Sequence, residues 1–240
     1  GSHRDSCSRK ILTDFVGRAF RRPGGPDEVK EYLTVFQMVR KQGEPFEEGI
    51  ATALAAVLVS PKFLYRIEAD QPARAGRTSA PVSSHELASR LSYFLWSSMP
   101  DEALLEAAGK GTLRNPAVLE AQVRRMLRDP KASALAEEFA GQWLQIRNVE
   151  VVRPDHERFP LFEDSLRAAM KKETELFLGH IFRQDRSVLE ILDAPYSFWN
   201  ERLARFYGVP GIVGPEFRQV DVSSTERGGG VLAHASVLTV

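Results

Sequence analysis

Apolar residues return every three or four positions along most of this chain, which is the spacing of one face of an α-helix. The pattern is most regular between Ser83 and Ile146. Three apolar stripes follow one another there: Leu87, Leu91 and Leu95; Leu119, Val123, Met126 and Leu127; and Leu135, Phe139, Trp143 and Ile146. Each stripe predicts a helix with one buried side. We therefore expect an all-α protein built as an antiparallel multi-helix bundle.

Helix start signals support this fold class. Ser83 and Glu86 have the spacing of a capping box, in which each side chain accepts a hydrogen bond from the other residue's backbone N–H. Three further starts, at Ser98–Asp101, Asn115 and Asp129, place a proline at or near the first turn. Starts so close together predict short helices that run antiparallel to one another.

The same pattern divides the chain into four segments. Residues 4–69 are predicted to form an N-terminal three-helix unit, and residues 70–82, which are rich in proline and small polar residues, a linker. Residues 83–208 are predicted to be the main helical domain. Residues 209–240 combine Gly, Pro and Val with some alternation, which predicts a small irregular or β-hairpin element that begins a following domain. The apolar end of this last segment indicates that the polypeptide continues.

Composition excludes several classes of function. The 32 basic and 32 acidic residues cancel, so the chain lacks the strongly basic face of a nucleic-acid-binding protein. Cys7 is the only cysteine, which excludes an internal disulfide, a cysteine-rich zinc site and haem attachment through Cys-x-x-Cys-His. No apolar run approaches the roughly 20 residues of a membrane span. We expect no nucleic-acid partner, no membrane span, and neither metal nor cofactor in this segment; the sequence carries no signal of oligomeric state.

No catalytic motif of high specificity is present. One polar loop is a candidate for acid–base catalysis. Asp155, His156 and Glu157 stand between Arg153 and Arg158 in an irregular stretch. A histidine beside carboxylates suits general acid–base catalysis near neutral pH, and loops often carry function. A polar surface loop has the same composition by default, so His156, Asp155 and Glu157 are weak catalytic candidates.

Glu173 is the fourth weak catalytic candidate. It stands on a predicted helix that begins near Asp164, and it shares a helical face with His180. A di-iron bundle would need Glu-x-x-His on two helices, and position 176 is Leu176. We interpret this part of the helix as a solvated face.

Two further features have structural interpretations. Gly228–Gly230 lack the Lys-Ser/Thr of a phosphate loop, so we expect a tight turn that lets two segments approach closely. Five aromatic residues are expected in the core rather than in a carbohydrate or cofactor platform: Phe94, Trp96, Trp143, Phe198 and Trp199. Trp96 is the exception to test, because it stands beside Leu95 and off the main apolar stripe.

Several segments of the sequence resemble a bacterial family labelled domain of unknown function 1592. They are ASRLSYFLWSSMPDEALLEAA (88–108), FAGQWLQ (139–145), ETELF (173–177) and NERLARFYG (200–208). Two further segments resemble the small helical domain that precedes the DUF1592 domain in this family: RKILTDFVGRAFRRP (9–23) and SPKFLYRIE (60–68). RGGGVLAHASVLT (227–239) resembles the opening of the domain that follows it.

The resemblance implies large exported proteins, periplasmic or extracellular, in which these domains stand beside c-type cytochrome modules. Any haem c would then lie elsewhere in the parent protein, and no catalytic residue can be carried over. Our leading hypothesis is a non-catalytic helical scaffold or partner-binding module whose partners are neighbouring domains of the same protein. The alternatives are an enzyme or carbohydrate-binding domain that uses the loop at 153–158, and a protein-interaction domain with an exposed apolar patch.

Overall fold

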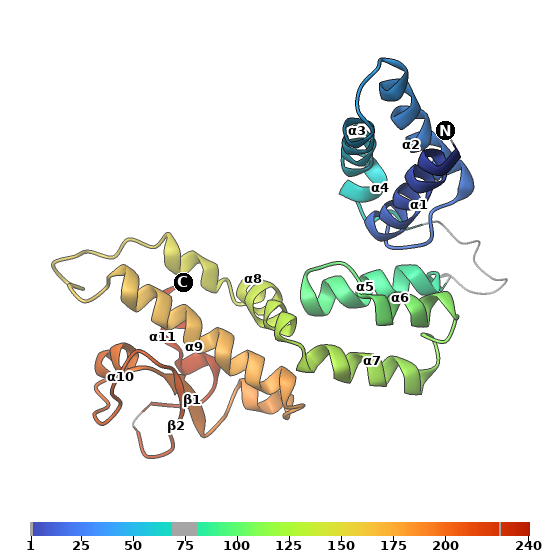
Figure 1. Cartoon of the computed structure of the whole chain (residues 1–240). Helices are drawn as coiled ribbons and strands as arrows, with labels where there is room; N and C mark the ends of the chain where they lie inside the picture. The colour runs from blue at the N-terminus through green and yellow to red at the C-terminus, as the bar shows by residue number, and fades with distance from the viewer. Residues whose placement is uncertain (1, 69–80, 226) are drawn as a thin grey trace. The chain divides into compact units, whose positions relative to one another are not determined.

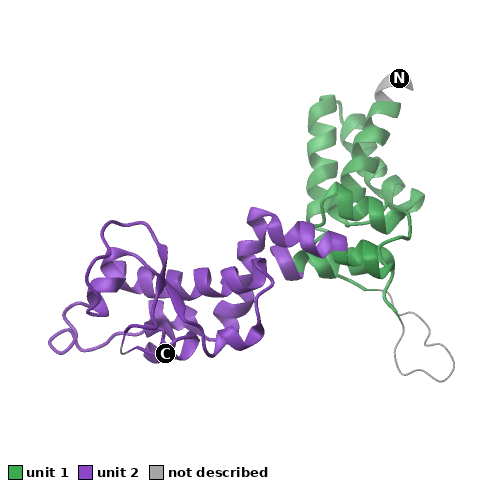
Figure 2. Ribbon diagram, turned by 90° about the horizontal axis from the view of Figure 1, so that it is seen from below, with its two compact units in different colours: residues 1–93, 98–120 green, residues 94–97, 121–240 purple. Residues whose placement is uncertain are grey.

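The computed structural model describes residues 2–68, 81–225 and 227–240 (Figure 1). The described residues are mostly helical and include one small two-stranded antiparallel sheet near the C-terminus, which confirms the predicted all-α class with a small β element. Apart from its last two residues, the predicted linker at 70–82 lies outside the described residues. Two compact units are present, one of residues 1–93 and 98–120 and the other of residues 94–97 and 121–240 (Figure 2).

The first unit begins with three packed helices and a short fourth one. They are α1 (Ser2–Ala19), α2 (Pro26–Lys41), α3 (Phe46–Leu58) and α4 (Pro61–Leu64). Their apolar stripes meet in a single core, because the helices pack pairwise on one another. This core consists of Leu12, Val16, Ala19, Phe20, Val29, Tyr32, Leu33, Phe36, Ala53 and Val57.

Three more helices begin at the predicted start signals. They are α5 (Ser84–Trp96), α6 (Glu102–Gly109) and α7 (Pro116–Arg128). The Ser83 N–H donates to Glu86 Oε2 at 2.5 Å, and the Glu86 N–H donates to Ser83 Oγ at 3.2 Å. Asp101 and Asn115 likewise accept backbone N–H bonds at the starts of α6 and α7. The predicted capping box is therefore present. Pro116 occupies the first position of α7 as predicted, whereas Pro100 precedes Asp101, the N-cap of α6, and lies outside that helix.

The second unit has a less regular helical part before its longest helix. After η1 (Pro130–Ala132) come the π-helix η2 (Leu135–Ala140), α8 (Gly141–Trp143), η3 (Ile146–Glu150), α9 (Asp164–Arg183) and η4 (Val188–Ile191). The predicted burial of Phe139 and Trp143 is wrong, because 47% and 54% of these residues are exposed. A π-helix bonds residue i to i+5 instead of i+4, which rotates the following residues out of the α-helical stripe.

The C-terminal part of the second unit carries the sheet. Its elements are β1 (Tyr196–Trp199), α10 (Glu201–Phe206), β2 (Arg218–Asp221), η5 (Val231–Ala233) and α11 (Ala235–Thr239). The strands are antiparallel, with Tyr196 opposite Asp221 and Trp199 opposite Arg218. β2 lies in the segment where a β element is expected. β1 is not predicted by the pattern, because neighbouring residues of this strand are buried without alternation.

The helix α9 organises the second unit. It packs against η2, η3, η4, β1, α10 and α11. Its buried stripe consists of Leu166, Ala169, Met170, Glu173, Thr174, Phe177, Leu178 and Ile181. A carboxylate and a hydroxyl therefore lie in the middle of an apolar core. In the described part of the chain, no helix is both long and apolar enough to cross a membrane.

Candidate functional site

Glu173 is a buried carboxyl group on the inner side of α9. Only 1% of the residue is exposed, so the interpretation of this position as part of a solvated face is wrong. Glu173 follows Met170 by three residues and precedes Phe177 by four, which is the spacing of the buried stripe. That spacing is the sequence signal that could have identified Glu173 as a buried residue.

Three side chains donate hydrogen bonds to the Glu173 carboxyl group. Ser197 Oγ and Trp199 Nε1, both on β1, donate to Oε1 at 2.7 and 2.6 Å, and the Tyr207 hydroxyl donates to Oε2 at 2.5 Å. Burial raises the pKa of Glu173 to about 7, although the three donors and the nearby Arg227 charge act in the opposite direction. Desolvation therefore outweighs the hydrogen bonds, and the carboxyl group titrates near neutral pH.

His234 extends this polar network beyond Glu173. A hydrogen bond of 2.9 Å joins its Nδ1 to Thr174 Oγ1, which is also 2.7 Å from Ser236 Oγ. The edge of the ring meets Phe177, with the ring centroids 4.9 Å apart. Burial, with a smaller contribution from the Arg227 charge, lowers the pKa of His234 to about 3. The imidazole is therefore neutral at neutral pH.

Tyr207 and Arg227 connect the network to the C-terminal segment. The backbone N–H of Ala235 donates to the Tyr207 hydroxyl at 3.0 Å. The guanidinium carbon of Arg227 lies 3.7 Å from the centroid of the Tyr207 ring, and Nη2 of Arg227 donates to the Ala233 carbonyl at 2.5 Å. Burial and the Glu173 charge raise the pKa of Tyr207. The phenol therefore stays protonated and remains a donor to Glu173.

The three glycines line one side of the network. A Cβ atom at Gly229 would overlap the carbonyl oxygen of Ala194, and one at Gly230, where φ is +77°, would overlap that of Leu192. This confirms the predicted close approach of two segments at this turn. The space left beside Glu173 and His234 is about 10 Å³, which is room for one water molecule at most.

The groups of this arrangement can exchange a proton, and the space beside them is small. Glu173 titrates near pH 7 and a neutral imidazole stands nearby, which are properties of catalytic acids and bases. Each Glu173 oxygen already accepts a hydrogen bond, and the space beside it is close to that of a single water. The network therefore joins the segment after Gly230 to α9 and β1. Over the described ranges, no group of three or more His, Cys, Asp or Glu is placed to hold a metal ion.

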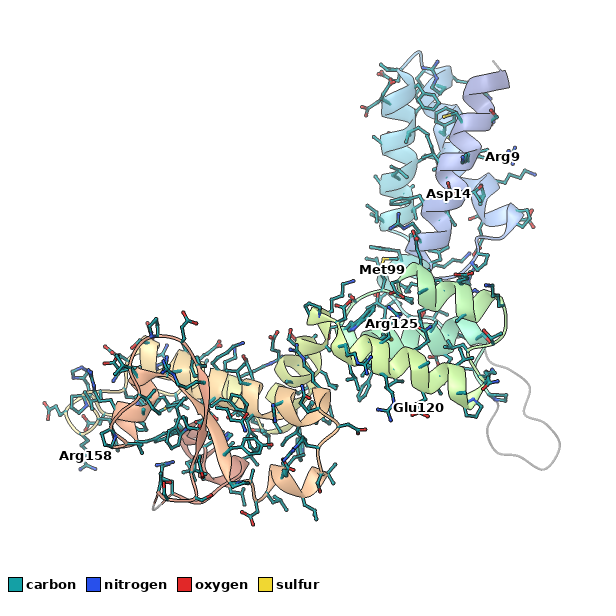
Figure 3. The ribbon with its side chains drawn as sticks, turned by 60° about the horizontal axis from the view of Figure 1, so that its bottom comes forward. Arg9, Asp14, Met99, Glu120, Arg125 and Arg158 are labelled. Carbon is teal, nitrogen blue, oxygen red and sulfur yellow. The ribbon has the colours of Figure 1, made fainter. Side chains whose placement is uncertain are left out.

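The polar loop lies apart from this network. Asp155, His156 and Glu157 are all exposed. Oδ1 of Asp155 accepts the Glu157 N–H at 2.9 Å, and Oδ2 lies 3.9 Å from Nε of Arg158, which Figure 3 labels on the outside of the second unit. Among the described residues, no hydrogen bond joins His156 to a carboxylate. The structure thus places the four sequence candidates in two places, with three on an exposed loop and Glu173 in the core.

Three aromatic residues form an exposed aromatic cluster on the second unit. Phe94, Phe139 and Trp143 are 58%, 47% and 54% exposed. The rings of Phe139 and Trp143 stack with centroids 6.1 Å apart, and Phe94 meets Phe139 edge-on at 6.1 Å. The prediction that Phe94 and Trp143 belong to the core is therefore wrong. It is confirmed for Trp199 and for Trp96, whose indole N–H donates to the Met126 carbonyl at 2.9 Å.

Comparison with known proteins gives two family matches. The model of the PSD4 family, described as a protein of unknown function (DUF1592), matches residues 82–209. That of the PSD5 family, described as a protein of unknown function (DUF1595), matches residues 7–68. No curated protein and no solved structure matches the chain. Glu173 and its three donors lie within the first match, whereas Arg227 and His234 follow it.

Proposed function

We propose that this chain, which belongs to the DUF1592 family, is a non-catalytic helical module that binds a partner domain. The observation that carries the proposal is the exposed aromatic cluster of Phe94, Phe139 and Trp143. Exposing three adjacent aromatic rings to water is unfavourable, and aromatic residues are enriched where proteins contact one another. A partner that covers these rings would remove them from water.

The closed network around Glu173 supports a non-catalytic role. The groups with the most strongly shifted pKa values in the second unit, Glu173, Tyr207 and His234, all lie in this network. Such groups are the usual candidates for catalysis. Here Tyr207 donates directly to Glu173, and His234 bonds to Thr174 on the same helix, beside a space of about 10 Å³. We therefore assign these groups the role of holding the fold together.

The partner that we propose is a haem-bearing cytochrome c domain of the same exported protein. This part of the proposal is supported by the resemblance of residues 88–108, 139–145 and 200–208 to a family that stands beside such domains. Haem c would then belong to the partner, since Cys7 alone cannot form the Cys-x-x-Cys-His attachment site. The exposed rings would pack on the surface of that domain.

The test is calorimetric titration of this chain with the cytochrome c domain expressed from the parent reading frame. Trp143→Ala should weaken binding by about tenfold or more, because buried tryptophans dominate interface energies. Phe159→Ala is the matched control, since Phe159 is also exposed (56%) but lies in the polar-loop region. This variant should bind like the wild type.

Two outcomes contradict the proposal. One is equal binding by the wild type and Trp143→Ala. The other is a loss of ligand binding or turnover in His156→Ala with no effect of Trp143→Ala, which would favour the alternative that uses the loop at 153–158.

A further inference from the structure

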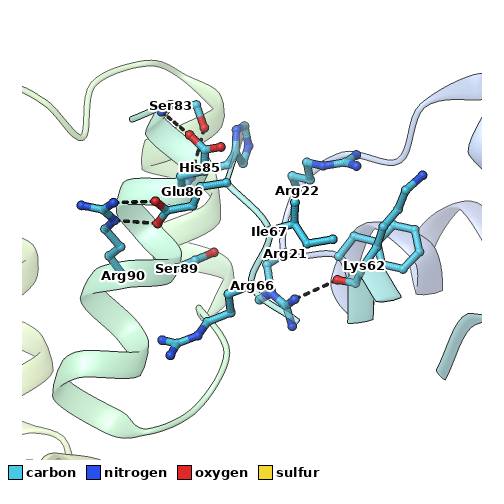
Figure 4. A pocket seen from close by; sticks show the side chains of 12 residues that line it. Arg21, Arg22, Lys62, Arg66, Ile67, Ser83, His85, Glu86, Ser89 and Arg90 are labelled. Carbon is cyan, nitrogen blue, oxygen red and sulfur yellow. Dashed lines mark hydrogen bonds and ion pairs between the residues drawn. The ribbon is translucent and has the colours of Figure 1, made fainter. Parts of the chain in front are cut away.

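The first unit contains an open pocket of about 520 Å³, which is within the size range of small-molecule sites (Figure 4). Its walls come from the end of α1, the segment around α4 and the first turns of α5. Side chains that line it include Arg22, Lys62, Arg66, His85, Ser89 and Arg90. Phe20 and Ile67 contribute apolar surface.

Cationic side chains outnumber carboxylates in this lining. Five arginine and lysine residues line the pocket, against two glutamates. Glu86 accepts the Ser83 N–H, and Glu68 binds Arg90 through two hydrogen bonds of 2.6 and 2.5 Å. The Glu68–Arg90 pair is therefore neutral as a unit, and an excess of positive charge is left elsewhere in the pocket.

One centre of positive charge is the pair of Arg22 and Lys62. Both bind the same carboxylate, that of Glu28, at 2.8 and 2.6 Å. The hydrogen bond from Arg22 holds the pKa of Glu28 well below its usual range, so the carboxylate is ionised. Two cations share one anion, and this side of the pocket keeps one net positive charge.

The second centre is Arg66. Its guanidinium lies over the Tyr93 ring, 4.6 Å from the centroid, which holds the charge in place and leaves the planar N–H groups for other acceptors. Arg22 and Lys62 lie on one side of the pocket, and Arg66 and Arg90 lie on the other (Figure 4).

Arg21 fixes the backbone that carries Lys62 and Arg66. It is only 6% exposed, and its guanidinium donates to the carbonyls of Lys62, Phe63 and Tyr65. The segment from α4 to Arg66 is thereby held against the end of α1. The two centres of positive charge are positioned before any ligand arrives, which reduces the entropy lost on binding.

We propose that this pocket binds a small organic dianion of the dicarboxylate class. One acidic group would pair with Arg22 and Lys62, the other with Arg66, and the carbon spacer would lie on Phe20 and Ile67. His85 is half-buried and also lines the pocket. The inference is independent of the partner-binding proposal, which concerns the second unit.

The test is calorimetric titration of the full chain with succinate at low ionic strength. Binding with a dissociation constant near or below about 1 mM is expected, and it should weaken as salt screens the charges. Succinamide has the same length without charge and should bind at least about tenfold more weakly. Propionate, with one carboxylate, should also bind more weakly than succinate.

Variants connect the binding to the two centres. Arg66→Gln and Lys62→Gln should each weaken succinate binding by about tenfold, because each removes a charged hydrogen bond. Arg114→Gln is the matched control, since Arg114 is an exposed arginine of the same unit that does not line the pocket. It should leave the affinity unchanged, and circular dichroism verifies that each variant is folded.

Four results would overturn the inference. They are no detectable succinate binding, equal binding of succinate and succinamide, equal effects of Arg66→Gln and Arg114→Gln, and binding of inorganic phosphate as tight as that of succinate. The last result would indicate a site for a compact anion rather than for an organic dianion.

Discussion

Burial and hydrogen bonding have opposite effects on the pKa of Glu173. Its pKa lies near 7 in the folded chain, against 4.5 without the fold. The folded state therefore binds this proton more tightly than the unfolded state does. Protonation of Glu173 therefore contributes about 3 kcal/mol to the free energy of unfolding. This contribution is complete below pH 4.5 and is lost as the pH rises through 7.

Glu173→Gln should remove this pH dependence, because the amide stays neutral as the protonated acid does. We expect the free energy of unfolding of the variant, relative to the wild type, to rise by about 3 kcal/mol between about pH 4 and pH 8. Urea unfolding followed by circular dichroism measures it. Glu157→Gln, on the exposed loop, is the control and should show a constant difference. A constant difference for Glu173→Gln as well would contradict the burial argument.

His234 acts in the opposite direction. Its pKa falls from 6.5 to about 3 on folding, so its stabilisation is complete above pH 6.5 and is lost as the pH falls through 3. His234→Asn cannot be charged, and we expect its stability to change less with pH over this range than that of the wild type, by up to about 5 kcal/mol in total. The same unfolding experiments measure this, and parallel pH profiles for variant and wild type are the result that contradicts it.

The sequence pattern predicts the burial of the apolar neighbours of Glu173 better than the burial of Glu173 itself. The spacing of Met170 and Phe177 predicts a buried stripe, and Glu173 falls on it. A charged side chain normally indicates a solvated position, and that general rule led to the wrong interpretation. The donors Ser197, Trp199 and Tyr207 come from β1 and the end of α10, and their meeting at Glu173 is a tertiary property that no local pattern contains.

At the scale of elements, the turn at Gly228–Gly230 determines how closely the C-terminal segment approaches α9. Gly229→Ala should destabilise the chain by about 2–4 kcal/mol, because the new Cβ atom would overlap the Ala194 carbonyl oxygen and the backbone must move. Gly228→Ala is the matched control, since no atom lies within 4 Å of its Cβ position. In thermal unfolding, Gly229→Ala should have a lower melting temperature than Gly228→Ala. Equal melting temperatures would contradict the close approach of Gly229 to the Ala194 carbonyl.

Helix starts were predictable, whereas departures from α-helical geometry were not. Ser83, Asp101 and Asn115 act through hydrogen bonds within a few residues, so the sequence contains the whole signal. The π-helix η2 and the strand β1 both pack against α9, and these tertiary contacts are not contained in the local sequence of either element. The exposed aromatic cluster was missed for this reason, because the π-helix moves Phe139 and Trp143 out of their stripe.

At the scale of the whole molecule, the two units carry different features. The pocket lined by Arg22, Lys62 and Arg66 belongs to the first unit, whereas the Glu173 network and the exposed aromatic cluster belong to the second. Gly229→Ala should therefore speed hydrogen exchange in peptides from α9, β1 and α11 and leave α1 to α3 unchanged, because local opening follows cooperative units. Mass spectrometry of the exchanging full chain provides this comparison. A uniform increase across both units would be the contrary finding.

The central claim is that the network around Glu173 is closed and holds the fold together. Hydrogen exchange of the three indole N–H groups, followed by nitrogen-edited NMR, tests it most directly. The Trp199 indole donates to Glu173 in the core, whereas the Trp143 indole belongs to an exposed side chain. We expect the Trp199 proton to exchange only on unfolding of the second unit, orders of magnitude more slowly than that of Trp143. Comparable exchange rates for Trp199 and Trp143 would mean that water reaches Glu173 freely and that the network is open.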